Sequence, residues 1–296
     1  MRRVILSLVI FTVVFAGSLP LFAQTKFSVA EMARSSENVV VATVTKIDEK
    51  SDPPQVYVTV TEALKGPTPK EKKLTIALQP DDIGGKDPVA EPFKNGKSYI
   101  LFLIQIEDKF AFLFQNLSGK LLVKDKKWLD IHREMIKGIK ILDDAASNAD
   151  RTRKIQKYLK NQSEIVQEWA LTEIQIKSMQ YEMKTLLPAL TGFLNSKNAG
   201  VRKRALMAVT RAYDMESEHG YSQDLNLIKI LIDGLKDKEL EIREFAHQQL
   251  RSHTRKAFGY DPKANETERN KTISFWEKWW KEEKQAKEEE GKKQPE

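Results

Sequence analysis

Basic side chains are the groups whose type and spacing point most directly to chemistry, and they gather in the second half of the chain. The candidate partner-binding residues are Arg202, Lys203, Arg204, Arg243, Arg251 and Arg255. Clustered positive charge can bind nucleic acid or an anionic surface. Residues 126–296 carry 33 Lys+Arg and 28 Asp+Glu, with the two signs interleaved. This modest excess favours a solvated helix face over a nucleic-acid site, while an anionic polymer or lipid headgroup stays a candidate partner.

The residues that usually perform catalysis or hold metals are scarce. The chain has no Cys and 4 His, which excludes disulfides, thiolate metal sites and Cys nucleophiles. The histidines do not follow a metal-ligand spacing. The sequence contains neither a nucleophile elbow nor a glycine-rich phosphate loop. We therefore expect a protein that is not an enzyme and that has no catalytic residues, cofactor or bound metal.

The N-terminal segment predicts export. Met1-Arg2-Arg3 is a short positive start, Val4 to Ala16 is apolar, and Pro20 and Ala23 follow. This order is typical of a secretory signal with a cleavage site after a small residue. The alternative is an uncleaved anchor, since Val4 to Ala23 nearly spans a bilayer. We expect residues 1–23 to be a signal peptide, the mature protein to be periplasmic or secreted, and no transmembrane segment to remain after cleavage.

Residues 24–125 predict a small β-barrel domain. Five short runs are rich in β-branched or aromatic residues: 39–44, 56–60, 74–78, 99–104 and 110–114. Turn chemistry separates them, for example Asp52-Pro53-Pro54, Lys65-Gly66-Pro67 and Lys94-Asn95-Gly96. Short strands with alternating burial and little helix are typical of a closed or nearly closed barrel.

Three motifs in this domain carry a resemblance. They are Val39-Val40-Val41-Ala42-Thr43-Val44, residues 57–66 ending in Leu64-Lys65-Gly66, and residues 92–103 beginning Pro92-Phe93-Lys94-Asn95-Gly96. The region resembles the OB-fold barrel of exported bacterial proteins related to the metalloproteinase-inhibitor and netrin modules. In the animal inhibitors an N-terminal cysteine chelates the protease zinc. This chain has no cysteine, so that activity is not carried over.

After Lys126 the apolar period becomes helical and an internal repeat appears. Equivalent apolar positions recur at an offset of 41, as in Leu190 and Leu231 or Val201 and Ile242, and a less regular copy precedes them at an offset of 35. Repeats of about 40 residues, each an antiparallel helix pair, are typical of a helical solenoid. One pair cannot bury both of its faces, so neighbouring pairs must stack. We expect a solenoid over residues 126–285, with its first helix starting near Trp128.

The repeats also resemble a family. The hydrophobic-Arg-x-x-Ala step occurs as Val201-Arg202-Lys203-Arg204-Ala205 and Ile242-Arg243-Glu244-Phe245-Ala246, and residues 258–280 close the array. From Ser163 to Trp280 the chain is similar to HEAT repeats of the exported bacterial kind. The resemblance implies a binding scaffold and brings no catalytic residues with it.

The end of the chain predicts a cap and a tail. Trp276, Trp279 and Trp280 fall on one face of a helix, which suits a last helix that covers the apolar end of a solenoid. Residues 286–296 are charged without an apolar face, and we expect them to be disordered.

Together these patterns predict a multidomain α and β protein, a small OB-like β-barrel followed by a HEAT-like α-solenoid. We expect a non-catalytic scaffold that docks a protein or peptide partner in the cell envelope on its second-helix face. One alternative is a binding module for an anionic envelope glycan or lipid. A second alternative is a protease-inhibitor-like module.

Overall fold

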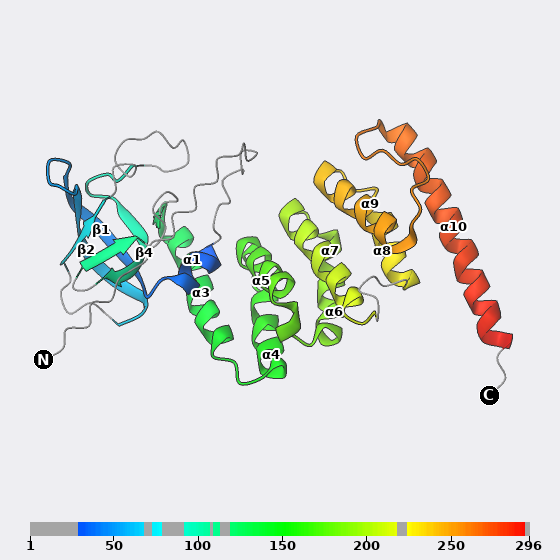
Figure 1. Ribbon diagram of the computed structural model, residues 1–296, viewed down its shortest axis with the longest axis horizontal. Coiled ribbons are helices and arrows are strands. Elements are labelled where there is room, and N and C mark those ends of the chain that lie inside the picture. The colour runs from blue at the N-terminus through cyan, green and yellow to red at the C-terminus, as the bar shows by residue number, and fades with distance from the viewer. Residues whose placement is uncertain are drawn as a thin grey trace, which may run out of the picture.

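The computed structural model describes residues 29–67, 73–78, 92–106, 109–112, 119–217 and 224–293. The predicted signal segment, residues 1–23, lies outside these ranges. Figure 1 shows strands at one end of an elongated molecule, helices standing in a row beside them, and α10 at the far end. This order confirms the predicted fold class. Within the described ranges, none of the helices has the length and apolar character needed to span a bilayer.

The first part of the chain is a ring of strands. Its elements are β1 (Asn38–Asp48), β2 (Gln55–Lys65), β3 (Lys73–Ala77), β4 (Ser98–Ile106), β5 (Lys109–Phe112) and β6 (Lys120–Leu122). They pair in the order β1-β2-β3-β5-β4, and β4 also pairs with β1, which closes the ring. The pairing of β3 with β5 is parallel, and the others are antiparallel. The short β6, which pairs with β4 outside the ring, was not predicted.

Strand β1 is buried on both faces, which explains its unbroken run of valines. Val40, Ala42 and Val44 point into the barrel core, whereas Val39 and Val41 belong to the core of the helical part. Side chains alternate between the two faces of a strand. The sequence of a strand that lies between two cores is therefore continuously apolar.

The second part of the chain consists of stacked helices. They are α3 (Lys126–Asp143), α4 (Asn148–Leu159), α5 (Glu164–Ile176), α6 (Met183–Gly192), α7 (Ala199–Asp214), α8 (Leu225–Gly234), α9 (Leu240–Thr254) and α10 (Glu266–Lys293), with 3-10 turns at Ser178–Gln180 and Phe193–Asn195. Contacts join α4 to α5, α6 to α7 and α8 to α9, and α5, α7 and α9 are successive neighbours. Most of the apolar positions that defined the repeat are buried, including Leu190, Val201, Leu231 and Ile242. We call α3–α10 the helical array.

The barrel and the helical array share one continuous core. Val39, Val41 and Phe102 from the outside of the barrel belong to the same apolar cluster as the array. A short helix, α1 (Val29–Ser35), also lies in this cluster, through Ala30, Met32 and Ala33. The prediction of little helix before Asp125 is therefore incomplete, because α1 contributes to the array rather than to the barrel interior. Polar contacts strengthen the junction, since Arg133 of α3 donates to Glu62 of β2 at 2.6 Å.

The last helix closes the far end of the array. Trp276 is completely buried, and the indole N–H of Trp280 donates to the backbone oxygen of Leu225 in α8 at 2.8 Å. The tail prediction is wrong as far as Lys293, because α10 continues to that residue. Its sequence is rich in Glu, Lys, Gln and Ala, which are strong helix formers. Lys284 and Glu288, spaced at i and i+4, form an ion pair at 3.9 Å that further stabilises the helix.

Candidate docking groove

The turn between α6 and α7 is held by Arg202, whose guanidinium contacts two successive turns. Its Nη1 donates to the backbone oxygens of Ser196 at 2.9 Å and Lys197 at 3.2 Å, which belong to its own turn. Its Nε and Nη2 donate to the carboxylate of Asp237, in the next turn, at 2.7 and 2.8 Å. This two-pronged contact fixes the spacing between the two turns.

The same arrangement recurs one repeat later. Arg243 donates through Nη1 to the backbone oxygens of Asp237 at 2.9 Å and Lys238 at 2.8 Å, and through Nε to that of Pro262 at 3.0 Å. At the equivalent place in the first copy, Gln167 donates to the backbone oxygen of Asn161 at 2.6 Å. The arginine of the hydrophobic-Arg-x-x-Ala step therefore links neighbouring turns.

Two of the predicted partner-binding residues have a structural role. Arg202 and Arg243 are each only 8% exposed, and their guanidinium groups are occupied by the contacts above. Contact with a partner through either guanidinium would require breaking these links between turns, and the expectation that the two residues bind a partner stays a prediction. Lys203 lies on the α7 surface, where its ammonium donates to Glu241 of α9 at 2.5 Å.

The other predicted partner-binding residues, Arg204, Arg251 and Arg255, lie apart from the turns between α6 and α7 and between α8 and α9. Arg204 lies half-buried on α7, whereas Arg251 and Arg255 are exposed at the end of α9. None of these three forms an ion pair in the described part of the chain. They therefore stay available for a contact outside the protein.

The charges of the Arg202–Asp237 pair stabilise each other. Burial raises the pKa of Asp237, but hydrogen bonds from Arg202 and from the backbone N–H of Glu239 outweigh it and hold that pKa below its usual value. The hydrogen bonds to Asp237 likewise raise the pKa of Arg202. Both groups are thus charged across the physiological pH range, and the ion pair persists there.

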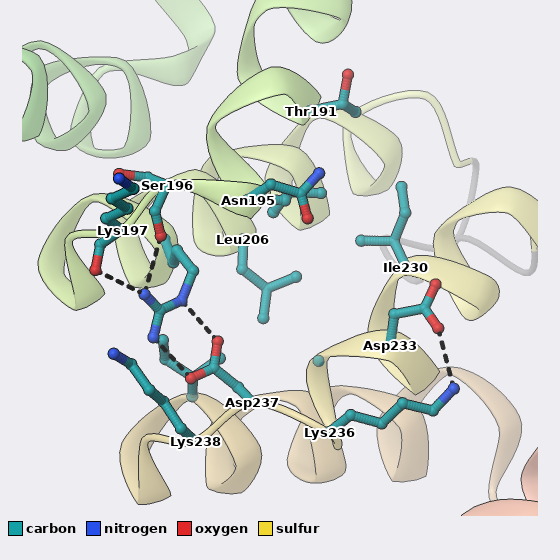
Figure 2. Close-up of a pocket in the computed structure, with 14 residues that line it drawn as sticks. Thr191, Asn195, Ser196, Lys197, Leu206, Ile230, Asp233, Lys236, Asp237 and Lys238 are labelled. Atoms are coloured by element: carbon teal, nitrogen blue, oxygen red, sulfur yellow. Dashed lines mark hydrogen bonds and ion pairs between the residues drawn. The ribbon is translucent and has the colours of Figure 1, made fainter.

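A groove of about 740 Å³ lies between these two turns (Figure 2). Its apolar lining comes from Leu194, Leu206, Ile230 and Ile242. Gly234 lets α8 pack closely against α9, since a β-carbon at this position would lie 2.9 Å from the β-carbon of Ala246 in α9. The volume is in the range of sites that hold small ligands or a few side chains of a partner.

The two sides of the groove differ in charge. On one side, Asp233 is neutralised by Lys229 at 2.6 Å, and Lys236 pairs with Glu277 of α10 at 2.6 Å. On the other side are Lys197 and Lys238, drawn at the left of Figure 2 beside the labelled Asp237. Both lysines are exposed, and neither ammonium group makes a hydrogen bond or ion pair within the described residues. This side of the groove therefore presents unpaired positive charge.

Lys197 and Lys238 were not singled out from the sequence, although a signal was present. They occupy equivalent places in two short polar segments, residues 195–198 and 236–239, separated by the same offset of 41 that relates Leu190 to Leu231. Only the folded turns show that the two positions line one groove.

The groove has the chemistry of a binding surface. It combines an apolar floor with a cationic side, and no group of three or more metal-ligating side chains occurs among the described residues. No family model matches the chain, and no curated protein matches it either. The arrangement can accept an apolar side chain in its floor and a carboxylate at the two lysines.

Proposed function

We propose that this protein is an exported, non-catalytic scaffold that docks a protein or peptide partner in the groove between the turns of its helical array. The observation that carries the proposal is the combination of an apolar floor with two lysines, Lys197 and Lys238, whose ammonium groups have no hydrogen-bond or ion-pair partner among the described residues. The cell envelope is the proposed place of action, because the N-terminal segment has the pattern of a secretory signal.

The groove supports a particular class of partner. Leu194, Leu206 and Ile230 offer apolar contact at the bottom, while the ammonium groups of Lys197 and Lys238 lie on one side. An extended or helical segment with one or two large apolar residues next to Asp or Glu matches this distribution. Charge complementarity of this kind sets orientation and the rate of encounter, and the apolar contact supplies most of the affinity.

The rigidity of the walls also supports docking. The two turns are linked by the Arg202–Asp237 ion pair. Arg243 in addition holds the second of these turns through the backbone oxygen of Asp237 at 2.9 Å. A preformed groove loses little conformational entropy when a partner binds. The partner then contributes most of the ordering cost, which suits a short flexible segment.

The test is site-specific photocrosslinking in cells that make the protein. A photoreactive amino acid at Asn195, on the groove wall, is expected to crosslink a discrete partner. The same amino acid at Lys157, exposed on α4 away from the groove, serves as the matched control. The crosslinked peptide of the partner, sequenced by mass spectrometry, is expected to contain an acidic residue beside an apolar one.

Charge reversal makes the test specific. Lys197→Glu with Lys238→Glu is expected to abolish the crosslink at Asn195, because two repulsive charges replace two attractive ones. Lys157→Glu with Lys271→Glu changes the net charge equally at exposed positions outside the groove and is expected to leave it intact. Equal loss in both double variants, or equal crosslinking from Lys157, would overturn the proposal.

A further inference from the structure

A second pocket, distinct from the docking groove, lies at the end of α9. Its volume is about 560 Å³, and its walls come from α9 and the loop that follows it. The lining residues that matter here are His247, Arg251, Arg255 and Lys256, together with one acid, Glu244. The pocket is on the side of the array near α10, whereas the docking groove lies between the turns of the repeats.

The cationic groups of this pocket are not neutralised by the protein. Arg251 and Arg255 form no ion pair or side-chain hydrogen bond within the described residues. Lys256 lies over the ring of Trp279, 5.4 Å from its centre, and pairs with no carboxylate in the part of the chain that the structure describes. Three positive charges therefore meet one negative charge, that of Glu244, in a concave site. Elsewhere in the array, by contrast, Arg202 is paired with a carboxylate.

A buried and unpartnered nitrogen is the second observation. His247 packs edge-on against Tyr260, with ring centres 5.1 Å apart, and its Nε2 is buried and makes no hydrogen bond to any described residue. Burial, followed by the nearby charge of Arg251, lowers the pKa of His247, so the ring is neutral at physiological pH. Buried polar atoms in proteins are nearly always hydrogen-bonded, so the His247 ring at the pocket wall carries a hydrogen-bonding group that the described residues leave unsatisfied.

We propose that this pocket binds a phosphoryl group. A carboxylate carries one charge and two oxygens, whereas a phosphate monoester carries close to two charges and three terminal oxygens. The second matches an excess of two positive charges and the several N–H donors of two guanidinium groups, an ammonium and an imidazole. The pocket is larger than a phosphate ion, so it also has room for the start of the molecule that bears the group.

The same cations have an ordinary structural role that must be separated from ligand binding. Positive side chains near the C-terminus of a helix interact favourably with its dipole, and Arg251 and Arg255 lie at the end of α9. Arg255 offers a way to separate the two roles. Its backbone is left-handed, with φ of 58°, and its N–H donates to the backbone oxygen of Arg251 at 2.8 Å. Glycine is the residue best suited to that conformation.

The experiment is calorimetric titration of the full chain with inorganic phosphate, at constant ionic strength maintained with chloride. Arg255→Gly is expected to weaken phosphate binding about tenfold or more, because one charged donor is lost. The same variant is expected to keep or raise the melting temperature, because glycine relieves the left-handed backbone. A purely structural role for Arg255 would not produce both changes.

Further variants and ligands complete the test. Glu244→Gln is expected to strengthen phosphate binding severalfold, and Lys271→Ala, outside the pocket, to leave it unchanged. Glucose 6-phosphate and phosphatidic acid vesicles, with phosphatidylcholine vesicles as control, then distinguish a soluble phosphate monoester from a lipid headgroup that carries one. Binding to either source supports the proposal. Phosphate binding no tighter than that of chloride, or equal affinity in Arg255→Gly and the unmodified chain, would overturn it, without affecting the docking groove.

Discussion

The barrel and the helical array solve the same problem, burying apolar surface, in different ways. In the barrel the strands form a closed ring, and the residues inside it, such as Val58, Ile76 and Leu101, belong to a separate apolar cluster made of barrel residues. The array is open, so each helix pair leaves one apolar face that the next pair must cover. The ends of the array therefore need dedicated caps, whereas the barrel needs none.

The two caps are of different kinds. At the far end, α10 covers the last pair with Trp276 and the ring of Trp280. At the near end, the outside of the barrel, with Val41 and Phe102, and the short helix α1 perform the same task. The barrel is thus both a closed unit in its own right and the first cap of the array. This double role predicts that the array cannot be stable without either neighbour.

Removing the main side chain of the far cap is expected to have the largest effect. Trp276→Ala deletes a fully buried ring that packs edge-on against Phe258. We expect a loss of about 4 kcal/mol in the free energy of unfolding, the usual cost of deleting a buried aromatic ring. All 5 tryptophans of the chain lie between residues 128 and 280, so denaturant unfolding followed by their fluorescence reports on the array.

The adjacent residue provides the control. Phe275 is 46% exposed, and Phe275→Ala is expected to cost less than about 1 kcal/mol. Similar costs for the two variants would show that α10 is not a cap and would remove the distinction between the open array and the closed barrel.

The link between turns is expected to have the next largest effect. Arg202→Ala leaves Asp237 without its ion-pair partner and leaves the backbone oxygens of Ser196 and Lys197 without their side-chain donor. Breaking one side of a buried ion pair costs about 3 kcal/mol. Differential scanning calorimetry of Arg202→Ala is expected to show a lower melting temperature than that of the unmodified chain. Arg204→Ala is expected to lower it less, because the side chain of Arg204 has no ion pair among the described residues.

This variant also sharpens the comparison of the two regions. Amide hydrogen exchange of Arg202→Ala is expected to rise in α7, α8 and α9 while barrel strands such as β2 keep their protection, because the lost contact lies within the array. Equal loss of protection in β2 would mean that the array and the barrel unfold as one unit.

The architecture could be predicted because the alternation of the strands and the repeat of the helix pairs are both periodic patterns in the sequence. Alternation over Val56 to Val60 and the recurrence of Leu190 at Leu231 are visible without any knowledge of the fold. Helix α1 was missed, since its seven residues bury only small or flexible side chains such as Ala33 and Met32. Strand β6 was missed because three residues are too few to show a period.

The roles of the arginines were less predictable. Arg202 and Arg243 look the same in sequence as solvent-exposed arginines, and only the fold shows that each reaches the following turn, to Asp237 or Pro262. Conversely, the sequence around Lys238 is a short polar segment, residues 236–239, and does not show that this lysine lines a groove. Side-chain direction at a turn depends on where the neighbouring repeat lies, which local pattern does not reveal.

The junction of barrel and array is expected to show a moderate effect. Arg34 of α1 donates to the buried carboxylate of Glu173 in α5 at 2.7 Å and contacts Asp143 of α3 at 3.2 Å. Arg34→Ala is expected to cost about 2 kcal/mol, less than Arg202→Ala because Lys177 remains near Glu173 at 3.7 Å. A double-mutant cycle with Glu173→Gln is expected to give a coupling energy of about 1 kcal/mol. A coupling energy near zero would show that packing alone joins α1 to the helical array.

The smallest effect is a loss of stability of the array and the junction at acidic pH. Burial raises the pKa of Asp143, but hydrogen bonds and charges from Lys177 and Arg34 outweigh it and hold that pKa below its usual value, as Arg202 does for Asp237. A carboxyl whose pKa is lower in the folded state stabilises the protein above its unfolded pKa, about 3.9, and loses that contribution as pH falls through the folded value. Tryptophan fluorescence is therefore expected to show the array loosening below about pH 4. In Arg202→Ala the same curve is expected to be flatter between about pH 4 and pH 2, since Asp237 no longer has a lowered pKa. An equally steep curve in that variant would show that other carboxyls govern the acid response.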